Sequence, residues 1–489
     1  MLSNPKLYEI NTRVWINKFE KGTSLSSIPE SVFEDLADKG IDIVWTMGIW
    51  KTCTSLIESC CFSVDLVSSY SRSLTDWKKE DVIGSPFSID DYEVSSQFGN
   101  IINFREKLNK FGIKLFLDFV PNHFGATTRL LKTNPDVFLK GDTELLSKDP
   151  FTFFCPDNNS QEIFAHGRDP LFPAWTDTVQ VNYFSQTARD FMVEILLKLT
   201  ELCDGVRCDM AMLQLNNVFQ NTWLGVLNKK AFKKPKEEFW KYAINKVKEK
   251  SPDFIFLAEA YWDLEWNLQQ LGFDFTYDKR LTDRLGAGDV DSVKAHLRAD
   301  NNFQMKSTRF LENHDETRAV TKFGKKHTYA AAALMSTIQG MKLYYDGQFE
   351  GKKIRLPVQL GREPEEKVSE SLKEYYNTIL RITKSEIFKK GNWLMIDPLP
   401  ISDNNDTFEK IFAWQWKLGD EIRIVIINYS ASTSICRIRF ELKTSQKEIK
   451  LIDLLTNEEY LRSVNEIKSS GLFIELKSYH SHIFAIKDN

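Results

Sequence analysis

Short apolar runs alternate with amphipathic stretches through the first two-thirds of the chain. Before residue 205, for example, Phe191, Ile195 and Leu199 recur at every fourth position, which gives a helix one apolar face. Repeated units of a strand followed by such a helix are typical of a parallel sheet covered by helices. Eight strands are expected, at residues 9–15, 42–47, 114–120, 205–209, 254–259, 273–277, 308–311 and 342–345. Eight is the number that closes a (β/α)8 TIM barrel, so we expect an α/β fold of this kind.

A proline and a glycine mark the helix between the first two expected strands. Pro29 stands where a first helical residue is favoured, and Gly40 stands where that helix should end, directly before the second strand. These two residues therefore predict one complete helix of the outer layer.

Two segments interrupt the alternation. The residues after His123 are rich in Pro, Asp, Asn and aromatic side chains and show little periodicity, which predicts an insertion after the third strand. Near the C-terminus Ile438, Phe440 and Leu442 alternate with charged neighbours, as in a half-buried antiparallel strand. The expected organisation is a barrel at 1–123 and 184–390, an inserted domain B at 124–183 and a C-terminal all-β sandwich at 391–489.

The composition narrows the classes of partner. The 489 residues include 64 Lys and Arg against 68 Asp and Glu, a formal net charge of −4, so neither nucleic acid nor a membrane surface is an expected partner. The first residues lack a secretion signal and no stretch is apolar over enough residues to span a bilayer, which predicts a cytoplasmic protein. The seven cysteines match no disulfide framework or zinc-ligand spacing, so we expect reduced thiols.

Four acidic residues stand at or just after expected strands, where a parallel barrel places its active site. They are Asp118, Asp209, Glu259 and Asp315. Each lies in an apolar or tightly turned segment, where a carboxylate is costly to bury unless it is paired or functional. Glycosidic bond cleavage supplies one joint explanation, because a retaining mechanism needs two carboxyl groups about 5 Å apart.

Neighbouring strands supply that pair in Asp209 and Glu259. Arg207 lies two residues before Asp209, on the same side of its strand, where it can hold the nucleophile ionised and oriented. Glu259 follows the apolar run FIFLA, a setting that should raise its pKa and keep it protonated as the acid.

Four motifs of this sequence resemble the α-amylase family, family 13 of the glycoside hydrolases, in the family's order. They are DFVPNH at 118–123, GVRCDMA at 205–211, LAEA at 257–260 and LENHD at 311–315. The resemblance covers the whole chain, because the family also has an insertion after the third strand and a C-terminal β-domain. It implies an enzyme that hydrolyses or transfers α-glucosidic bonds of maltodextrins, glycogen-type glucans or small α-glucosides.

The resemblance also assigns roles to single residues. It implies that Asp209 is the nucleophile, Glu259 the general acid/base and Asp315 the stabiliser of the transition state. It places His123 and His314 on hydroxyls of the cleaved sugar, and Asp118 with Arg207 as a supporting pair. The segment GSPFSIDDY at 84–92 puts Phe87 where the family usually has a tyrosine platform under that sugar.

Two departures from the family limit what the resemblance implies. A Lys-His pair that many α-amylases carry beyond the nucleophile is replaced by Met212 and Leu213, which favours a less polar leaving-group side and short substrates over starch. Asn122 matches a calcium ligand of many members, but the sequence does not assign the partner carboxylate. No cofactor is needed for the chemistry, a structural calcium stays open, and so does the oligomeric state.

The alternative from another class is a carbohydrate-binding barrel that has lost catalysis. Loss of any of the three carboxylates would favour it, and the sequence retains Asp209, Glu259 and Asp315.

Overall fold

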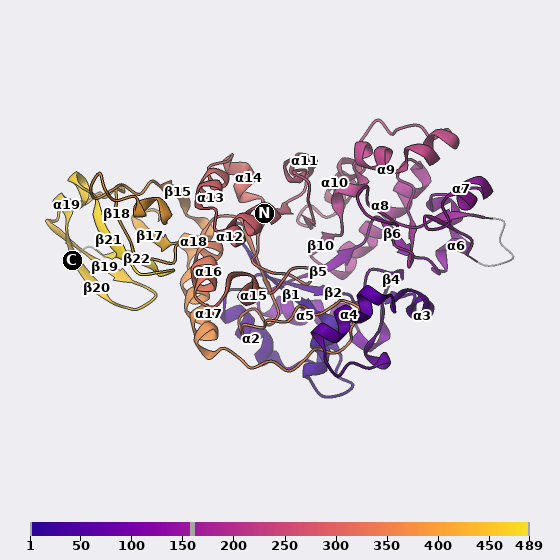
Figure 1. The fold of residues 1–489 in the computed structure, drawn as a ribbon, viewed down its shortest axis with the longest axis horizontal. Helices are drawn as coiled ribbons and strands as arrows, with labels where there is room; N and C mark the ends of the chain where they lie inside the picture. The colour runs from indigo at the N-terminus through magenta and orange to yellow at the C-terminus, as the bar shows by residue number, and fades with distance from the viewer. Residues whose placement is uncertain (1, 157–161, 488–489) are drawn as a thin grey trace.

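The computed structural model describes residues 2–156 and 162–487, and its centre is a closed barrel of eight parallel strands. The strand order around the barrel is β1-β14-β13-β12-β11-β10-β5-β2. The strands are β1 (Lys6–Asn11), β2 (Ile43–Met47), β5 (Lys114–Phe119), β10 (Gly205–Cys208), β11 (Ile255–Ala258), β12 (Phe275–Tyr277), β13 (Ser307–Arg309) and β14 (Met341–Tyr345). Helices surround this sheet (Figure 1), so the predicted (β/α)8 barrel is confirmed.

Seven of the eight strands lie within two residues of their predicted bounds, and the first does not. The prediction placed it at residues 9–15, but β1 ends at Asn11 and helix α1 (Thr12–Trp15) follows. The pairing of β1 with β2 ends at Asn11 and Met47, so the backbone beyond has no neighbouring strand. Val14 and Trp15 are nevertheless buried, so the apolar run continues past the true end of the strand.

The helix between β1 and β2 is α2 (Glu30–Asp38). Pro29 is its N-cap rather than its first residue, one position from the prediction. Gly40 follows the helix with φ +73°, the left-handed conformation that ends helices and that glycine adopts without strain.

The insertion after β5 is held together by short antiparallel pairs. β6 (His123–Gly125) pairs with β9 (Thr178–Gln180), and β7 (Phe153–Phe154) pairs with β8 (Phe164–Ala165). Phe138 packs edge-on against Phe124 and Phe164, which gives the insertion its own aromatic centre. In Figure 1 it lies at the opposite end of the molecule from the C-terminal strands.

The C-terminal part contains a six-stranded antiparallel sheet and a two-stranded sheet that share one apolar core. The larger sheet has the order β15-β16-β17-β22-β19-β20, from β15 (Asn392–Ile396), β16 (Ile411–Leu418), β17 (Glu421–Asn428), β22 (Ser481–Lys487), β19 (Glu448–Asp453) and β20 (Glu459–Ser463). The smaller sheet pairs β18 (Ser434–Ile438) with β21 (Leu472–Leu476). The predicted strand through Phe440 and Leu442 is therefore too long: both side chains pack against the core, but pairing stops at Ile438.

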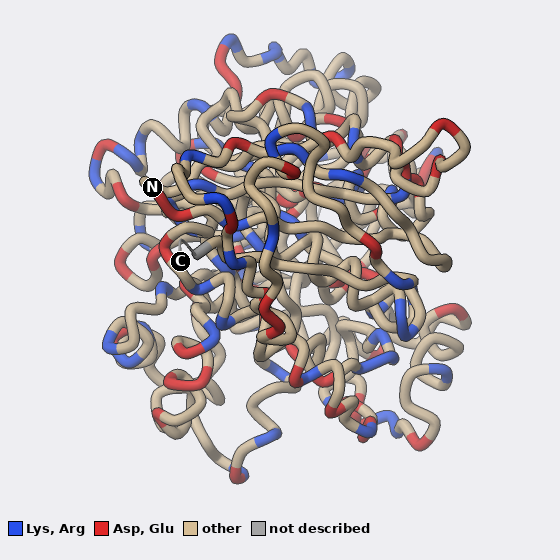
Figure 2. The backbone as a smooth tube through the Cα atoms, turned by 90° about the vertical axis from the view of Figure 1, so that its left-hand side faces the viewer, with Lys and Arg blue, Asp and Glu red and all other residues tan. Residues whose placement is uncertain are grey.

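The larger sheet also packs against the barrel. Trp414 and Trp416 on β16 belong to the same apolar core as the helices around the barrel, and the Trp416 Nε1–H donates to the Thr337 carbonyl at 2.6 Å. Lys, Arg, Asp and Glu are interspersed along the chain, without large regions of one sign (Figure 2). Within the described ranges, no helix combines the length and the apolar character needed to cross a membrane.

Candidate active site

A buried arginine links two of the predicted carboxylates at the C-terminal end of the barrel. Arg207 lies on β10, and Asp209 directly follows that strand. The Arg207 guanidinium donates to Asp209 Oδ1 at 2.5 Å and lies 2.8 Å from Glu259 Oε2. Glu259 follows β11, the neighbour of β10, so the two strands bring both carboxylates to one cation.

The backbone turn after Asp209 reinforces this arrangement. Met210 adopts a left-handed conformation, with φ +44°, which is uncommon and costly for a residue other than glycine. In that conformation its N–H donates to Glu259 Oε2 at 2.7 Å. The turn therefore holds the acid candidate beside the nucleophile candidate.

Burial raises the pKa of both carboxyl groups. Burial raises the pKa of Glu259 to about 7 and outweighs the nearby Arg207, as the apolar run before this residue predicts. Tyr261 also donates its hydroxyl to Glu259 Oε1 at 2.9 Å. Burial raises the pKa of Asp209 too, while Arg207 opposes the shift.

Asp315 lies beyond the end of β13 and is the most open of the three, with 49% of its side chain exposed. Its Oδ2 lies 2.9 Å from His314 Nε2. Partial burial alone would raise its pKa, but the charged His314 ring prevails and holds the pKa at about 2. His314 itself is fully buried between two carboxylates, Asp315 and Glu9, which hold its pKa well above the usual range.

Asp118 lies within β5, opposite Arg207 in the strand register, but it does not form the expected ion pair with that arginine. Among the described residues its carboxylate accepts from Trp45 Nε1 and from the Gly48 N–H, both at 3.0 Å. Arg207 instead pairs with the residues that follow β10 and β11, because its side chain extends toward the open end of the barrel. Burial raises the pKa of Asp118 to about 6.

Phe87 lies where the resemblance places the sugar platform. Its ring centroid is 5.6 Å from the Arg207 guanidinium carbon and 5.7 Å from the His314 ring. The side chain is only partly buried, which leaves ring surface for a ligand.

His123 begins β6, is buried and packs edge-on against Trp175. Burial lowers its pKa to about 4, so the ring is neutral near pH 7. Within the part of the chain that the structure describes, no hydrogen bond or ion pair joins it to the three carboxylates. The structure therefore brings Arg207, Asp209, Glu259, His314, Asp315 and Phe87 into one cluster, with His123 at its edge.

Three residues of this cluster did not stand out in the sequence. Glu9 contacts His314, the Tyr261 hydroxyl contacts Glu259, and Tyr277 on β12 packs beneath Arg207 with its ring centroid 5.8 Å away. Glu9 carried a usable signal, because it is the one carboxylate in the apolar run LYEIN. The two tyrosines carried none, since buried tyrosines are common in barrel cores.

Met212 and Leu213, which stand in place of the Lys-His pair, present no polar side chain and lie inside the protein. They belong to a 3-10 turn, Ala211–Gln214, and are 0% and 3% exposed. Their apolar side chains turn into the protein because no polar group holds them at the surface. The partly buried side chains next to the carboxylates are Met210, Tyr261 and Trp262.

Asn122, the candidate calcium ligand, already uses its side-chain oxygen. Asn122 Oδ1 accepts from Gln180 Nε2 at 3.0 Å. In the described ranges, no group of three His, Cys, Asp or Glu side chains is arranged to hold a metal ion. The described residues therefore do not fit a metal centre of that kind.

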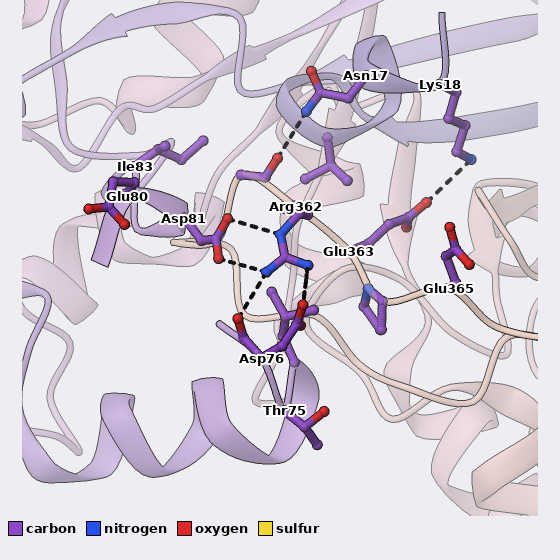
Figure 3. Close-up of a pocket in the computed structure, with 14 residues that line it drawn as sticks. Asn17, Lys18, Thr75, Asp76, Glu80, Asp81, Ile83, Arg362, Glu363 and Glu365 are labelled. Carbon is purple, nitrogen blue, oxygen red and sulfur yellow. Dashed lines mark hydrogen bonds and ion pairs between the residues drawn. The ribbon is translucent and has the colours of Figure 1, made fainter. Parts of the chain in front are cut away.

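A cavity of about 880 Å³ lies apart from this cluster, between the loops that follow β1, β2 and β14. Arg362 bridges its walls, with Nε at 3.0 Å and Nη2 at 2.8 Å from the two Asp81 carboxylate oxygens, and it also reaches Asp76 (Figure 3). Lys18 and Glu363 face each other across another edge (Figure 3). None of the predicted site residues lines this cavity. The candidate active site is therefore recognised by its cluster of carboxylates and not by this cavity.

Comparisons with known proteins agree with this geometry. The family description "Alpha amylase, catalytic domain" matches residues 84–377. The alpha-amylase MalA of Haloarcula japonica is 25% identical over 280 residues, which cover 54% of this chain and 36% of the relative. This chain thus spans little more than a third of that relative's length.

Solved structures match over nearly the whole chain. The noncanonic maltogenic alpha-amylase AmyB from Thermotoga neapolitana has a TM-score of 0.68 at 20% identity, with 99% of each chain covered. The trehalose-6-phosphate hydrolase of Bacillus licheniformis has a TM-score of 0.64 at 14% identity, also with 99% of each chain covered. At these identities the likeness shows the fold.

Proposed function

The chain belongs to the α-amylase family of glycoside hydrolases, and we propose that it cleaves or transfers α-glucosidic bonds through a covalent glycosyl-aspartate. The observation that carries the proposal is the bridge from Arg207 to Asp209 and Glu259, at 2.5 and 2.8 Å. One guanidinium keeps the two carboxyl groups close, which favours the separation of about 5 Å of retaining enzymes over the wider spacing of inverting ones.

In the first step Asp209 attacks the anomeric carbon while Glu259 gives its proton to the departing glycosidic oxygen. The bond from carbon to that oxygen breaks and an ester to Asp209 forms. In the second step Glu259 takes a proton from water or from a sugar hydroxyl, whose oxygen displaces Asp209. The pKa of about 7 suits Glu259 to both halves, because it can give and regain a proton near neutral pH.

The other residues bind the reacting sugar. Asp315, with its pKa near 2, stays ionised and stabilises the positive charge that develops on the ring. Phe87 offers an aromatic face to the sugar, and His123 and His314 donate to its hydroxyls. Asp118 supports the strand ends through Trp45 and Gly48.

Short maltooligosaccharides or small α-glucosides are the proposed substrates. The chain lacks the polar Lys-His pair beyond the nucleophile, and each lost neutral hydrogen bond is worth about 0.5–1.5 kcal/mol. Tyr261 and Trp262 lie close to Glu259 in the chain and offer aromatic surface for an acceptor sugar. A sugar hydroxyl can therefore compete with water.

The seven free cysteines support a reducing, cytoplasmic setting. Two of them, Cys203 and Cys208, are buried at β10, and burial raises the pKa of both thiols. The enzyme should keep full activity in reducing buffer, and rapid inactivation there would contradict this setting.

Product analysis tests the proposed function. Purified protein is incubated with soluble starch and with maltooligosaccharides of rising length, with and without added glucose or maltose. We expect faster turnover of the short chains and new transfer products when a sugar is added. Asp209→Asn is the control, since the amide keeps the shape of the side chain but cannot form the ester. Binding of maltooligosaccharides without turnover would instead support a carbohydrate-binding protein.

A further inference from the structure

Glu9 is a fully buried carboxylate with apolar or aromatic neighbours, Tyr8 and Ile10, on either side in its strand. It lies on β1, opposite Trp45 of β2 and Tyr345 of β14, and 0% of it is exposed. A buried carboxylate needs a partner to offset its loss of hydration. Among the described residues, the partner is one side chain that lies 305 positions further along the chain, His314.

The contact between them is short and directed. Glu9 Oε1 lies 2.5 Å from His314 Nδ1, while His314 Nε2 lies 2.9 Å from Asp315 Oδ2. The imidazole ring is also flanked by Trp45 and Phe87, each with its centroid 5.7 Å away. Carboxylates at both nitrogens and aromatic rings at its sides leave the imidazole one orientation.

Charged and titratable groups from several elements face this contact. Tyr277 of β12, Tyr345 of β14 and Glu312 before His314 interact electrostatically with Glu9, and Asp118 of β5 does so with His314. The Arg207 guanidinium is paired with Asp209 and Glu259 rather than with Glu9.

Among the described residues, His314 is the positively charged side chain that forms an ion pair with Glu9. Within the described residues, Glu9 Oε2 and the Tyr277 hydroxyl have no hydrogen-bond partner. Glu312 is held separately by Arg318 at 2.6 Å. The carboxylate of Glu9 is thus directed at one histidine nitrogen.

We propose that Glu9 is a positioning residue for the proposed glycosidase reaction, because it holds the proton on His314 Nδ1 and so fixes the orientation of the ring, whose Nε2 lies 2.9 Å from Asp315 Oδ2. With both nitrogens protonated, His314 can only donate. Its positive charge then lies beside Asp315 throughout the reaction. Glu9 acts through His314 and does not touch the substrate.

The first test is Glu9→Gln, which keeps an oxygen that can accept from Nδ1–H but removes the charge. We expect kcat to fall at least tenfold with KM changed less than threefold, and the melting temperature to stay the same or rise. With an α-glucosyl fluoride, whose leaving group needs no proton from Glu259, the alkaline decline of activity should begin at lower pH, because His314 loses a charge that favours its protonated form. Unchanged kcat and pH profile in this variant would overturn the proposal.

A matched control is Asp278→Asn. Asp278 is also a buried carboxylate in contact with a histidine, with His296 Nε2 at 2.8 Å, but it also pairs with Arg309 and caps helix α12 (Lys279–Ala287), and none of its described contacts is with His314 or the three carboxylates. This variant should lose stability and keep the kcat and pH profile of the folded enzyme. A structural role for Glu9 would make the two variants alike.

The second test is a double-mutant cycle. His314→Gln removes the group through which Glu9 is proposed to act, so adding Glu9→Gln to it should change kcat less than twofold. Additive losses in the double variant would overturn the proposal, because Glu9 would then act by another route.

A third measurement separates this proposal from the proposed function. In the proton NMR spectrum we expect a strongly deshielded, exchange-protected imidazole N–H signal that is absent from His314→Gln and lost or shifted upfield in Glu9→Gln. This signal does not depend on turnover, so it stands even if no glycosidic bond is cleaved. An identical signal in Glu9→Gln and unmodified protein would overturn the role of Glu9.

Discussion

At the scale of single residues, Arg207 organises the site through charge and through stacking. It is fully buried, pairs with two carboxylates and lies 5.1 Å from the Trp45 ring centroid. Lysine at this position would provide only a point charge in place of a planar fork. The two acids have different further contacts: Glu259 Oε1 accepts from the Tyr261 hydroxyl, whereas Asp209 interacts electrostatically with Asp315 and His314.

The pKa of Glu259 predicts the pH dependence of catalysis. The proposed first step needs Glu259 protonated, and its pKa is about 7, so kcat/KM should fall as pH rises above about 7. Asp209 must be ionised, so activity should also fall on the acid side, and the two limits belong to the coupled pair. The profile is measured with a maltooligosaccharide and with an α-glucosyl fluoride, whose leaving group needs no proton. A decline above pH 7 that is the same for both substrates would contradict the role of Glu259.

Whether the sequence revealed a residue's role in the site depended on how far along the chain its partners lie. Asp209 and Glu259 stand directly after apolar strands, so their place in the barrel was readable. Glu9 also stands in an apolar run, but its role was not readable, because its partner His314 becomes its neighbour only when the barrel closes. The sequence also could not show that Met212 and Leu213 are buried, because a match by position does not show which way a side chain turns.

At the scale of the elements, β10 depends on a glycine at its start. An added Cβ at Gly205 would lie 2.4 Å from the Phe116 ring and 2.6 Å from the Ile255 carbonyl oxygen. The strand carries Arg207 and leads into Asp209, so a shift here would reach the site.

We therefore expect Gly205→Ala to lower the free energy of unfolding by about 1–3 kcal/mol, the cost of overpacking a core, and to lower kcat. Gly225→Ala is the control, since it lies in helix α9 (Asn216–Lys229) with nothing within 4 Å of the added Cβ. There alanine should be neutral or stabilise by up to about 1 kcal/mol. Urea unfolding of both variants measures the difference, and equal stabilities would contradict the close packing at β10.

Most of the barrel could be read from the sequence, because each strand is a short apolar run with a helix behind it. The exception shows the limit of that pattern. Beyond Asn11 the residues Val14 and Trp15 stay buried although the strand has ended, and hydropathy reports burial rather than pairing. The predicted strand through Phe440 was too long for the same reason: Phe440 packs against the core, but strand pairing ends at Ile438.

At the scale of the whole molecule, the C-terminal sheet and the barrel share one apolar core. Trp416 is 1% exposed and packs against Phe388. Its Nε1–H donates to the carbonyl of Thr337, the last residue of helix α16 (His327–Thr337). Tyr429 adds a hydrogen bond to the Leu285 carbonyl at 3.1 Å. The two parts should therefore unfold together.

Trp416→Ala tests this coupling. We expect a loss of about 3–5 kcal/mol in the free energy of unfolding, typical of truncating a buried tryptophan, and an earlier loss of activity on heating. Leu394→Ala is the control, because that side chain is exposed on β15 of the same sheet and should change stability by no more than about 0.5 kcal/mol. Loss of the C-terminal sheet in Trp416→Ala with an unchanged melting temperature of the barrel would contradict a shared core.

Trapping the glycosyl-enzyme intermediate shows whether Asp209 forms a covalent bond to the sugar. A 5-fluoro-α-glucosyl fluoride forms the ester readily but slows its breakdown, so the intermediate accumulates for intact-mass measurement and peptide mapping. We expect one added fluoroglucosyl group per chain, on the peptide that contains Asp209, and none in Asp209→Asn. Turnover of the reagent with no adduct, or an adduct on another residue, would contradict the account.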